Sequence, residues 1–287
     1  MNPIIKVNQV NLTYPNGYHA LKDINIDLYP GHICGLIGVN GSGKSSLFKV
    51  MMGVTEPTSG QVLIQNQANK VAFKQNLITY VPQTEEVDWN FPILVKDVVM
   101  MGRYAHMGIL RIPSRNDEQA VSEALEQVGM TAYKNRQIGE LSGGQKKRVF
   151  VARALAQGSD IILLDEPFTG VDTNTEEALI QLFQTLINQN RLIIVSTHNL
   201  GSVPYFCDEV ILIKEQIIAH GSIEQTFTEE NLSKAFGSML RHQHIVAKNI
   251  HKDQDKRSVT VITDDERPLV LYGDEDQQNI VKPESHQ

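Results

Sequence analysis

Short apolar runs separated by turn residues open the chain. Ile4 to Val10 is followed by Pro15, Asn16 and Gly17, and Ile24 to Leu28 is followed by Pro30 and Gly31. Apolar runs that end at such turn residues are typical of strands joined by tight connections. This spacing predicts a sheet-rich beginning.

A helical period replaces the strand pattern from about Val95 onward. Apolar residues recur at i, i+3, i+4 and i+7, which places them on one face of a helix while the acidic residues mostly look outward. The apolar positions are Val121, Ala124, Leu125 and Val128. A helical insert therefore follows the sheet.

Two continuous apolar runs, Ile161 to Leu164 and Leu192 to Val195, come after the insert. Each predicts a buried strand, and the segment between them predicts a helix. The apolar stripe of that helix contains Leu179, Leu182, Phe183 and Leu186. Because strand, helix and strand in this order form a parallel sheet, we expect an α/β fold.

The end of the chain has a different character, since it becomes polar and charged from about Arg241. Within it, Ser258 to Thr263 and Leu269 to Tyr272 flank a charged turn and predict a small hairpin. We expect a main domain over residues 1–240, with its helical part at about 84–160. Residues 241–287 would form an appendage that is partly disordered.

Composition narrows the class of protein. The chain has 287 residues, 41% of them hydrophobic, and a net charge of -7, which disfavours nucleic acid as a partner. Its start lacks the pattern of a secretory signal and its apolar runs are too short to span a bilayer, so we expect a cytoplasmic protein. Cys34 and Cys207 are expected to be buried free thiols rather than a disulfide or a metal site.

A glycine-rich loop carries the strongest chemical signal. The apolar run Ile33 to Ile37 leads into G-x-x-x-x-G-K-S at Gly38 to Ser45, and Ser45 to Met52 reads as a helix. In such a loop, backbone N–H groups turn around the β- and γ-phosphates, Lys44 adds charge, and Ser45 offers a hydroxyl to Mg²⁺. The sequence predicts a nucleoside triphosphate site; the alternative, a chance glycine-rich turn, is disfavoured by the strand and helix around the loop.

Two carboxylates follow the buried strand Ile161 to Leu164. Asp165 and Glu166 would lie at the carboxyl end of that strand, where open parallel sheets bind ligands. Asp165 can hold Mg²⁺ through water, while Glu166 can orient the water that attacks the γ-phosphate. A strand that simply ends in solvated charge is the alternative, and the phosphate loop makes it less attractive.

A second candidate anion site opens the helix that contains Val149, Ala152 and Leu155. Ser142, with the paired glycines after it, offers a hydroxyl, free N–H groups and the positive end of a helix dipole. Taken alone, an ordinary helix cap is the favoured interpretation.

Together these residues resemble the nucleotide-binding subunit of an ATP-binding cassette transporter, over about Ile4 to Gly237. The order of motifs carries the resemblance: the phosphate loop, Gln83, Leu141 to Gln145, Asp165-Glu166, Asp172 and His198. The resemblance implies a P-loop NTPase core with a mixed sheet, an antiparallel β subdomain and a helical subdomain that bears the signature Leu141 to Gln145.

The resemblance also implies roles for single residues. Tyr14 would stack on adenine, Gln83 would sense the γ-phosphate, and His198 would contact it; singly, these could be a packing aromatic, a surface amide and a capping residue. Glu166, His198 and Lys44 would be catalytic, and Ser45, Gln83 and Asp165 would bind Mg²⁺. The implied nucleotide contacts are Tyr14, Gly38, Asn40, Gly41, Ser42, Gly43, Lys44, Ser45, Ser46, Gln83, Ser142, Gly143, Gly144, Gln145, Asp165 and Asp172.

Partners follow from the same resemblance. Members of this family form a head-to-tail dimer in which the phosphate loop of one chain and Ser142 to Gln145 of the other enclose each ATP. Membrane passage would be supplied by separate permease subunits, which the insert beyond Gln83 would contact. The chain would then lie on the cytoplasmic face of the membrane as a peripheral subunit.

The start of the insert resembles the subunits of bacterial manganese, zinc and iron importers. The similarity lies in Thr84 to Pro92, which contains Trp89 and Phe91, and in Lys146-Lys147-Arg148 and Gly170-Val171-Asp172. It implies an importer ATPase for manganese or iron, with zinc possible, supplied indirectly by an extracytoplasmic metal-binding protein. Trp89 and Phe91 could also simply pack the insert.

Other interpretations are weaker. A soluble cassette ATPase that acts on nucleic acid or the ribosome would usually carry two cassettes or a long coiled coil, and neither pattern is present. A small-molecule kinase would leave Leu141 to Gln145 and His198 unexplained. Asp88 and His106 are not proposed as metal ligands, and a solvated tail is preferred to a metal sensor. The tail histidines are His242, His244 and His251.

Overall fold

The computed structural model describes residues 2–83 and 91–237, together with four strands of the tail. The prediction for Trp89 concerns residues outside the described part, as does the interpretation of the tail histidines' side chains. Among the described residues, no helix is long and apolar enough to cross a membrane.

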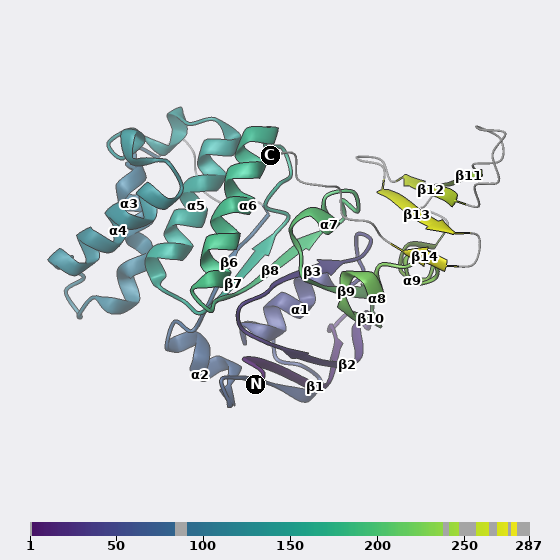
Figure 1. The fold of residues 1–287 in the computed structure, drawn as a ribbon. Coiled ribbons are helices and arrows are strands. Elements are labelled where there is room, and N and C mark those ends of the chain that lie inside the picture. Colours follow the sequence, from purple (N-terminus) through teal and green to yellow (C-terminus); the bar gives the residue numbers. More distant parts are fainter. Residues whose placement is uncertain are drawn as a thin grey trace.

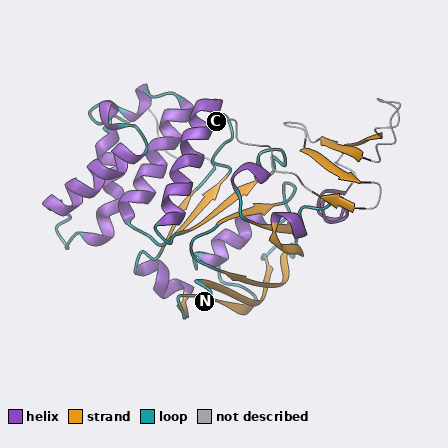
Figure 2. Ribbon diagram, viewed as in Figure 1, coloured by secondary structure: helices purple, strands orange, loops and turns teal. Residues whose placement is uncertain are grey.

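A six-stranded mixed sheet forms the centre of the protein (Figures 1 and 2). Its order is β10-β9-β3-β8-β7-β6, and all neighbours are parallel except the antiparallel pair β9 and β10. Strands β3, β7 and β8 are buried throughout, as their continuous apolar runs predict. The bounds are β3 Ile33–Ile37, β6 Ile78–Val81, β7 Ile161–Asp165, β8 Leu192–Thr197, β9 Glu209–Lys214 and β10 Gln216–Ser222.

An antiparallel sheet of order β2-β1-β4-β5 packs over helix α1, Lys44–Met51. Leu47 and Phe48 of this helix share one hydrophobic core with residues of both sheets, so α1 is held between two layers (Figure 1). The remaining elements of this part are β1 Ile5–Thr13, β2 His19–Leu28, β4 Ser59–Ile64, β5 Gln67–Ala68 and α2 Asn69–Lys74.

Helices cover the other face of the central sheet and extend away from it as a helical subdomain (Figure 1). The predicted stripe of Val121 to Val128 is buried there, as is that of Leu179 to Leu186. The bounds are α3 Val95–Met100, η1 Met101–His106, α4 Arg115–Gln127, η2 Thr131–Tyr133, η3 Ile138–Glu140, α5 Gly143–Gln157, α6 Thr173–Asn188, α7 Val203–Phe206, α8 Ile223–Thr226 and α9 Glu229–Phe236.

This architecture confirms the predicted fold class, with its mixed central sheet, antiparallel subdomain and helical subdomain. Cys34 and Cys207 are buried and free, as expected. In the tail, β12 Arg257–Thr263 and β13 Leu269–Asp274 pair antiparallel where the hairpin was predicted. The sequence did not predict their partners, β11 Arg241–Val246 and β14 Gln277–Asn279.

A buried ion pair anchors the start of α4 to the helical subdomain. Ser114 and Asp117 form a capping box, in which each side chain accepts a bond from the other's backbone N–H. Arg103 Nε donates to Asp117 Oδ1 over 2.9 Å, and another guanidinium nitrogen donates to Ala156 O over 2.8 Å. Hydrogen bonds from Ser114 and then Arg103 lower the pKa of Asp117 to about 2.

We therefore expect Asp117→Ala to lower the free energy of unfolding by about 2–4 kcal/mol, because it removes a helix cap and leaves Arg103 without its carboxylate. Urea denaturation followed by circular dichroism measures this. The difference from wild type should shrink as pH falls from about 4, the ordinary pKa of an aspartate, because protonation of Asp117 then removes the same stabilisation from the wild type. Glu118→Ala, at an exposed neighbour, should change stability by at most about 0.5 kcal/mol.

Candidate functional site

The glycine-rich loop connects β3 to α1 along a path that only small residues can follow. Gly43 has a φ of +106°, and a Cβ there would lie 2.7 Å from Ala20 O. A Cβ on Gly38 would lie 2.3 Å from Ile213 O. The backbone of the loop therefore packs against neighbouring strands without side chains, which leaves its N–H groups at the positive end of α1.

Lys44 places a buried charge at the loop. Its ammonium donates to Gly38 O over 2.6 Å and to Val39 O over 3.3 Å, and the residue is 7% exposed. Burial lowers the pKa of Lys44, while the nearby Glu166 and Asp165 carboxylates oppose that shift. Ser42 Oγ is also buried and has no hydrogen-bond partner among the described residues, so it can serve a ligand oxygen.

Three hydroxyl groups donate hydrogen bonds to Asp165 at the carboxyl end of β7. Ser45 Oγ and Tyr80 Oη each donate to Asp165 Oδ2 over 3.0 Å, and Ser196 Oγ donates to Oδ1. A carboxylate next to the loop hydroxyl is the kind of hard oxygen set that Mg²⁺ prefers, so these residues fit that ion. Sequence reasoning missed Tyr80 and Ser196, because their contact with Asp165 depends on which strands are neighbours.

Glu166 and His198 form a pair beside Asp165. His198 Nδ1 lies 2.7 Å from Glu166 Oε1, and the Glu166 side chain is 7% exposed. Thr169 Oγ1 donates to the other carboxylate oxygen over 3.4 Å, and Glu166 N donates to Ser196 O over 3.0 Å. Glu166 has a φ of +50°, which is costly for a residue with a side chain. The carboxylate is thus held in one direction by its surroundings.

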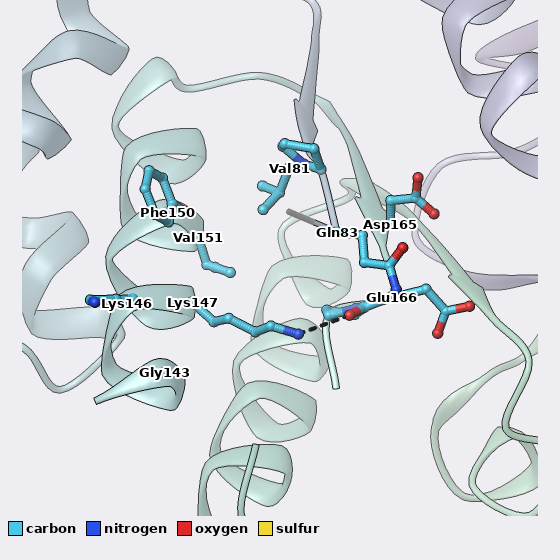
Figure 3. Close-up of a pocket in the computed structure, with 11 residues that line it drawn as sticks. Val81, Gln83, Gly143, Lys146, Lys147, Phe150, Val151, Asp165 and Glu166 are labelled. Carbon is cyan, nitrogen blue, oxygen red and sulfur yellow. Dashed lines mark hydrogen bonds between the residues drawn. The ribbon is translucent and has the colours of Figure 1, made fainter. Parts of the chain in front are cut away.

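One cavity brings most of the predicted site residues together. The glycine-rich loop, Gln83 and the carboxylates of Asp165 and Glu166 all line this cavity, although they come from segments far apart in the chain. Its lining residues are Tyr18, Asn40, Gly41, Ser42, Gly43, Lys44, Ser45, Ser46, Gln83, Asp165 and Glu166. Gln83, Asp165 and Glu166 also line a neighbouring cavity against α5, which Figure 3 shows.

The signature residues do not line the loop cavity. Ser142 Oγ accepts from Gln145 N over 3.3 Å and Gln145 Oε1 accepts from Ser142 N over 3.0 Å, so the pair is a capping box of α5. Asp172 similarly caps α6 through Thr175, whose hydrogen bonds lower the pKa of Asp172. Gly144 lies beside Asp172, with Asp172 Oδ2 3.6 Å from the place of a Cβ. The favoured interpretation of Ser142 as a helix cap is correct within one chain.

The aromatic residues near the loop form a pair that the sequence did not predict. Tyr14 Oη lies 3.1 Å from Ser46 Oγ, and the Tyr14 and Tyr18 rings stack at 6.5 Å between centroids. Tyr18 Oη donates to Gly41 O over 2.8 Å. The Tyr18 residue is 44% exposed. Tyr18 is therefore a second candidate for contact with a base, because its hydroxyl touches the loop itself.

A core of parallel strands whose glycine-rich loop and acidic strand end share one cavity is typical of P-loop proteins that bind nucleoside triphosphates. Residues 21–169 match the family described as ABC transporter. The chain belongs to the ATP-binding proteins of that family, which bind and hydrolyse ATP, dimerise and work with transmembrane permease subunits.

Named relatives cover nearly the whole chain. The chelated iron transport system membrane protein YfeB of Yersinia pestis is 58% identical over 95% of this chain and 92% of its own length. The manganese transport system ATP-binding protein MntA of Synechocystis sp. is 54% identical over 82% of this chain and 90% of its own.

Solved structures share the fold over similar lengths. A metal-chelate type ABC transporter in an inward-facing conformation superposes with a TM-score of 0.75 at 27% identity, over 93% of this chain and 98% of that one. A dimeric ATP-binding cassette in a post-hydrolysis state, bound to ADP and phosphate, gives a TM-score of 0.66 at 28% identity, over 76% of this chain and 98% of that one.

Lys44→Ala should weaken ATP binding by about tenfold or more, because the variant loses a charged donor to the phosphates. Equilibrium titration with a fluorescent ATP analogue measures the change. Lys49→Ala, at an exposed lysine of the same helix, removes the same charge farther from the loop and should bind the analogue as wild type does. Equal affinity of the Lys44 variant and wild type would contradict the role of the loop.

Proposed function

We propose that the chain is the ATP-hydrolysing subunit of an importer for a divalent transition metal, with manganese or iron as the favoured ion and zinc as a possible one. The contact between the buried Glu166 and the partly exposed His198, beside the phosphate loop, is the observation that carries the ATPase mechanism. The iron and manganese systems named for the two relatives support the choice of metal.

Binding of the triphosphate would use the loop from Gly38 to Ser46. Its N–H groups and Lys44 would contact the β- and γ-phosphates, and Tyr14 or Tyr18 would contact adenine. Ser45, Gln83 and Asp165 would hold Mg²⁺, which neutralises phosphate charge when bound. The hydroxyl groups around Asp165 support this assignment, because they keep its carboxylate beside Ser45.

Hydrolysis would depend on Glu166. Its carboxylate would accept a hydrogen bond from the attacking water and orient it toward the γ-phosphate, while His198 would contact that phosphate. The short contact between His198 Nδ1 and Glu166 Oε1 supports these two roles, because it places both side chains at the same end of the sheet. Lys44 would stabilise the charge on the phosphate oxygens.

A head-to-tail dimer would complete each site. Ser142, Gly143, Gly144 and Gln145 begin α5 away from the loop cavity of their own chain, and their helix dipole can face a phosphate bound to a second copy. Asp172 would lie at the same interface. Closure that requires a γ-phosphate, and opening after its removal, would supply the conformational cycle.

The permease would dock on the helical subdomain at the cytoplasmic face of the membrane. Large apolar side chains exposed there support this surface. They are Phe91, Tyr104, Ile109, Leu110 and Ile112. The transported ion would arrive from an extracytoplasmic metal-binding protein, and nucleic acid would have no part in the cycle.

Glu166→Gln should retain ATP binding, lose roughly 10²–10⁴-fold of turnover, and accumulate an ATP-bound dimer, because the neutral amide lacks the negative charge that polarises the attacking water. Phosphate release and size-exclusion chromatography with ATP measure both effects. Glu177→Gln, an exposed glutamate on α6, is the matched control. Turnover near that of wild type in the Glu166 variant would make the catalytic assignment wrong.

Deletion of the gene should reduce cellular uptake of radioactive manganese or iron, and wild type, but not Glu166→Gln, should restore it. Inductively coupled plasma analysis of manganese, iron and zinc in the same cells would identify the ion. Unchanged contents of all three metals, together with recovery of ribosomes or DNA with the native protein, would favour the alternative of a soluble cassette ATPase.

A further inference from the structure

Lys147 joins the signature helix to the catalytic turn of its own chain. From α5, its ammonium donates to Glu166 O over 3.1 Å, as the dashed line in Figure 3 shows, and also to Thr169 O. The two carbonyls lie at the two ends of the turn that follows β7. One cation therefore closes this turn from outside.

The turn needs such a restraint because its first residue has an unfavourable backbone. Glu166 has a φ of +50°, a conformation that persists only where surrounding contacts hold it. Within the turn, Thr169 N donates to Glu166 O over 3.3 Å, which is a long hydrogen bond. A charged donor on the same carbonyl is stronger than this neutral one.

Thr169 carries the restraint to the carboxylate itself. Its backbone carbonyl accepts from Lys147, and its hydroxyl donates a long hydrogen bond of 3.4 Å to Glu166 Oε2. Since His198 holds the other oxygen, Oε1, both oxygens of the carboxylate are directed by neighbours. A shift of Thr169 would therefore turn the carboxylate around its contact with His198.

The surroundings of Lys147 favour this geometry. Its side chain lines a cavity that it shares with the apolar side chains of Val81, Phe150 and Val151 and with Gln83, Asp165 and Glu166 (Figure 3). Burial lowers the pKa of Lys147, and the negative charge of Glu166 opposes that shift. A hydrogen bond from a charged ammonium to a carbonyl is stronger than one from a neutral donor; here the bond to Glu166 O is partly buried and the bond to Thr169 O is exposed.

We propose that Lys147 is a positioning residue for ATP hydrolysis, which holds the turn Glu166–Thr169 against α5 and thereby directs the Glu166 carboxylate. This role rests on the proposed function of Glu166. Lys147 follows Gln145 by two residues, so the helix that would contact the ATP of a partner also sets the catalytic turn of its own chain. A displacement of α5 is then transmitted directly to Glu166.

The test is steady-state ATPase kinetics on Lys147→Met, which keeps the apolar stem and removes the ammonium. We expect kcat to fall about ten- to hundredfold while KM for ATP and the affinity for a fluorescent ATP analogue stay within about twofold. Lys147→Arg keeps charge and donors and should recover most of kcat. Thr169→Val, at an exposed position, should also lower kcat without changing KM, and it covers the case of a Lys147→Met chain that does not fold.

The controls separate this role from the proposed function. Lys134→Met removes a charge from an exposed lysine of the helical subdomain and should leave kcat and KM unchanged. A kcat of Lys147→Met within twofold of wild type, or a loss that Lys147→Arg does not recover, overturns the role of Lys147 alone, provided that wild type hydrolyses ATP and Glu166→Gln does not. A wild type without ATPase activity overturns both proposals.

Discussion

Burial of charge at the carboxyl ends of the parallel strands of the central sheet is the constraint on which this structure depends. Lys44, Asp165 and Glu166 are each less than a tenth exposed, and a buried charge without partners costs several kcal/mol. Lys44 bonds two carbonyls of its own loop, whereas Asp165 and Glu166 meet Ser196 and His198 because β8 is the neighbour of β7. The register sets Asp165 beside Ser196, whose hydroxyl bonds its carboxylate. The sheet order thus provides hydrogen-bond partners that stabilise the two buried carboxylates.

The two hydrophobic cores position different elements of the site. The core between the sheets holds α1, and with it the glycine loop. The core on the other face of the central sheet holds α5 and α6, whose first residues carry the signature and Asp172. The turn Glu166–Thr169 follows β7, whose residues belong to both cores, and Lys147 bonds this turn to α5.

Local sequence patterns were sufficient for the loop, the buried strands and the stripes of the main helices. The run Ile33 to Ile37 is β3 with the predicted bounds, because a strand buried on both faces needs an uninterrupted apolar run. The patterns were insufficient for contacts made by side chains of ordinary type. Tyr18, Ser196 and Lys147 have no distinctive spacing, and their bonds to the loop, Asp165 and Glu166 exist only because distant segments are neighbours.

By itself, the sequence determined that this protein has a glycine-rich loop of the phosphate-binding pattern, an acidic strand end and a helix that begins after Ser142. Each of these depends on residues adjacent in the chain, where backbone geometry and side-chain type are enough. The tertiary structure decided that loop, Gln83 and carboxylates share one cavity while the signature lies outside it. Which residues share the cavity depends on the strand order and on the packing of α5. Both arise from burial of apolar surface across the whole domain rather than from any local pattern.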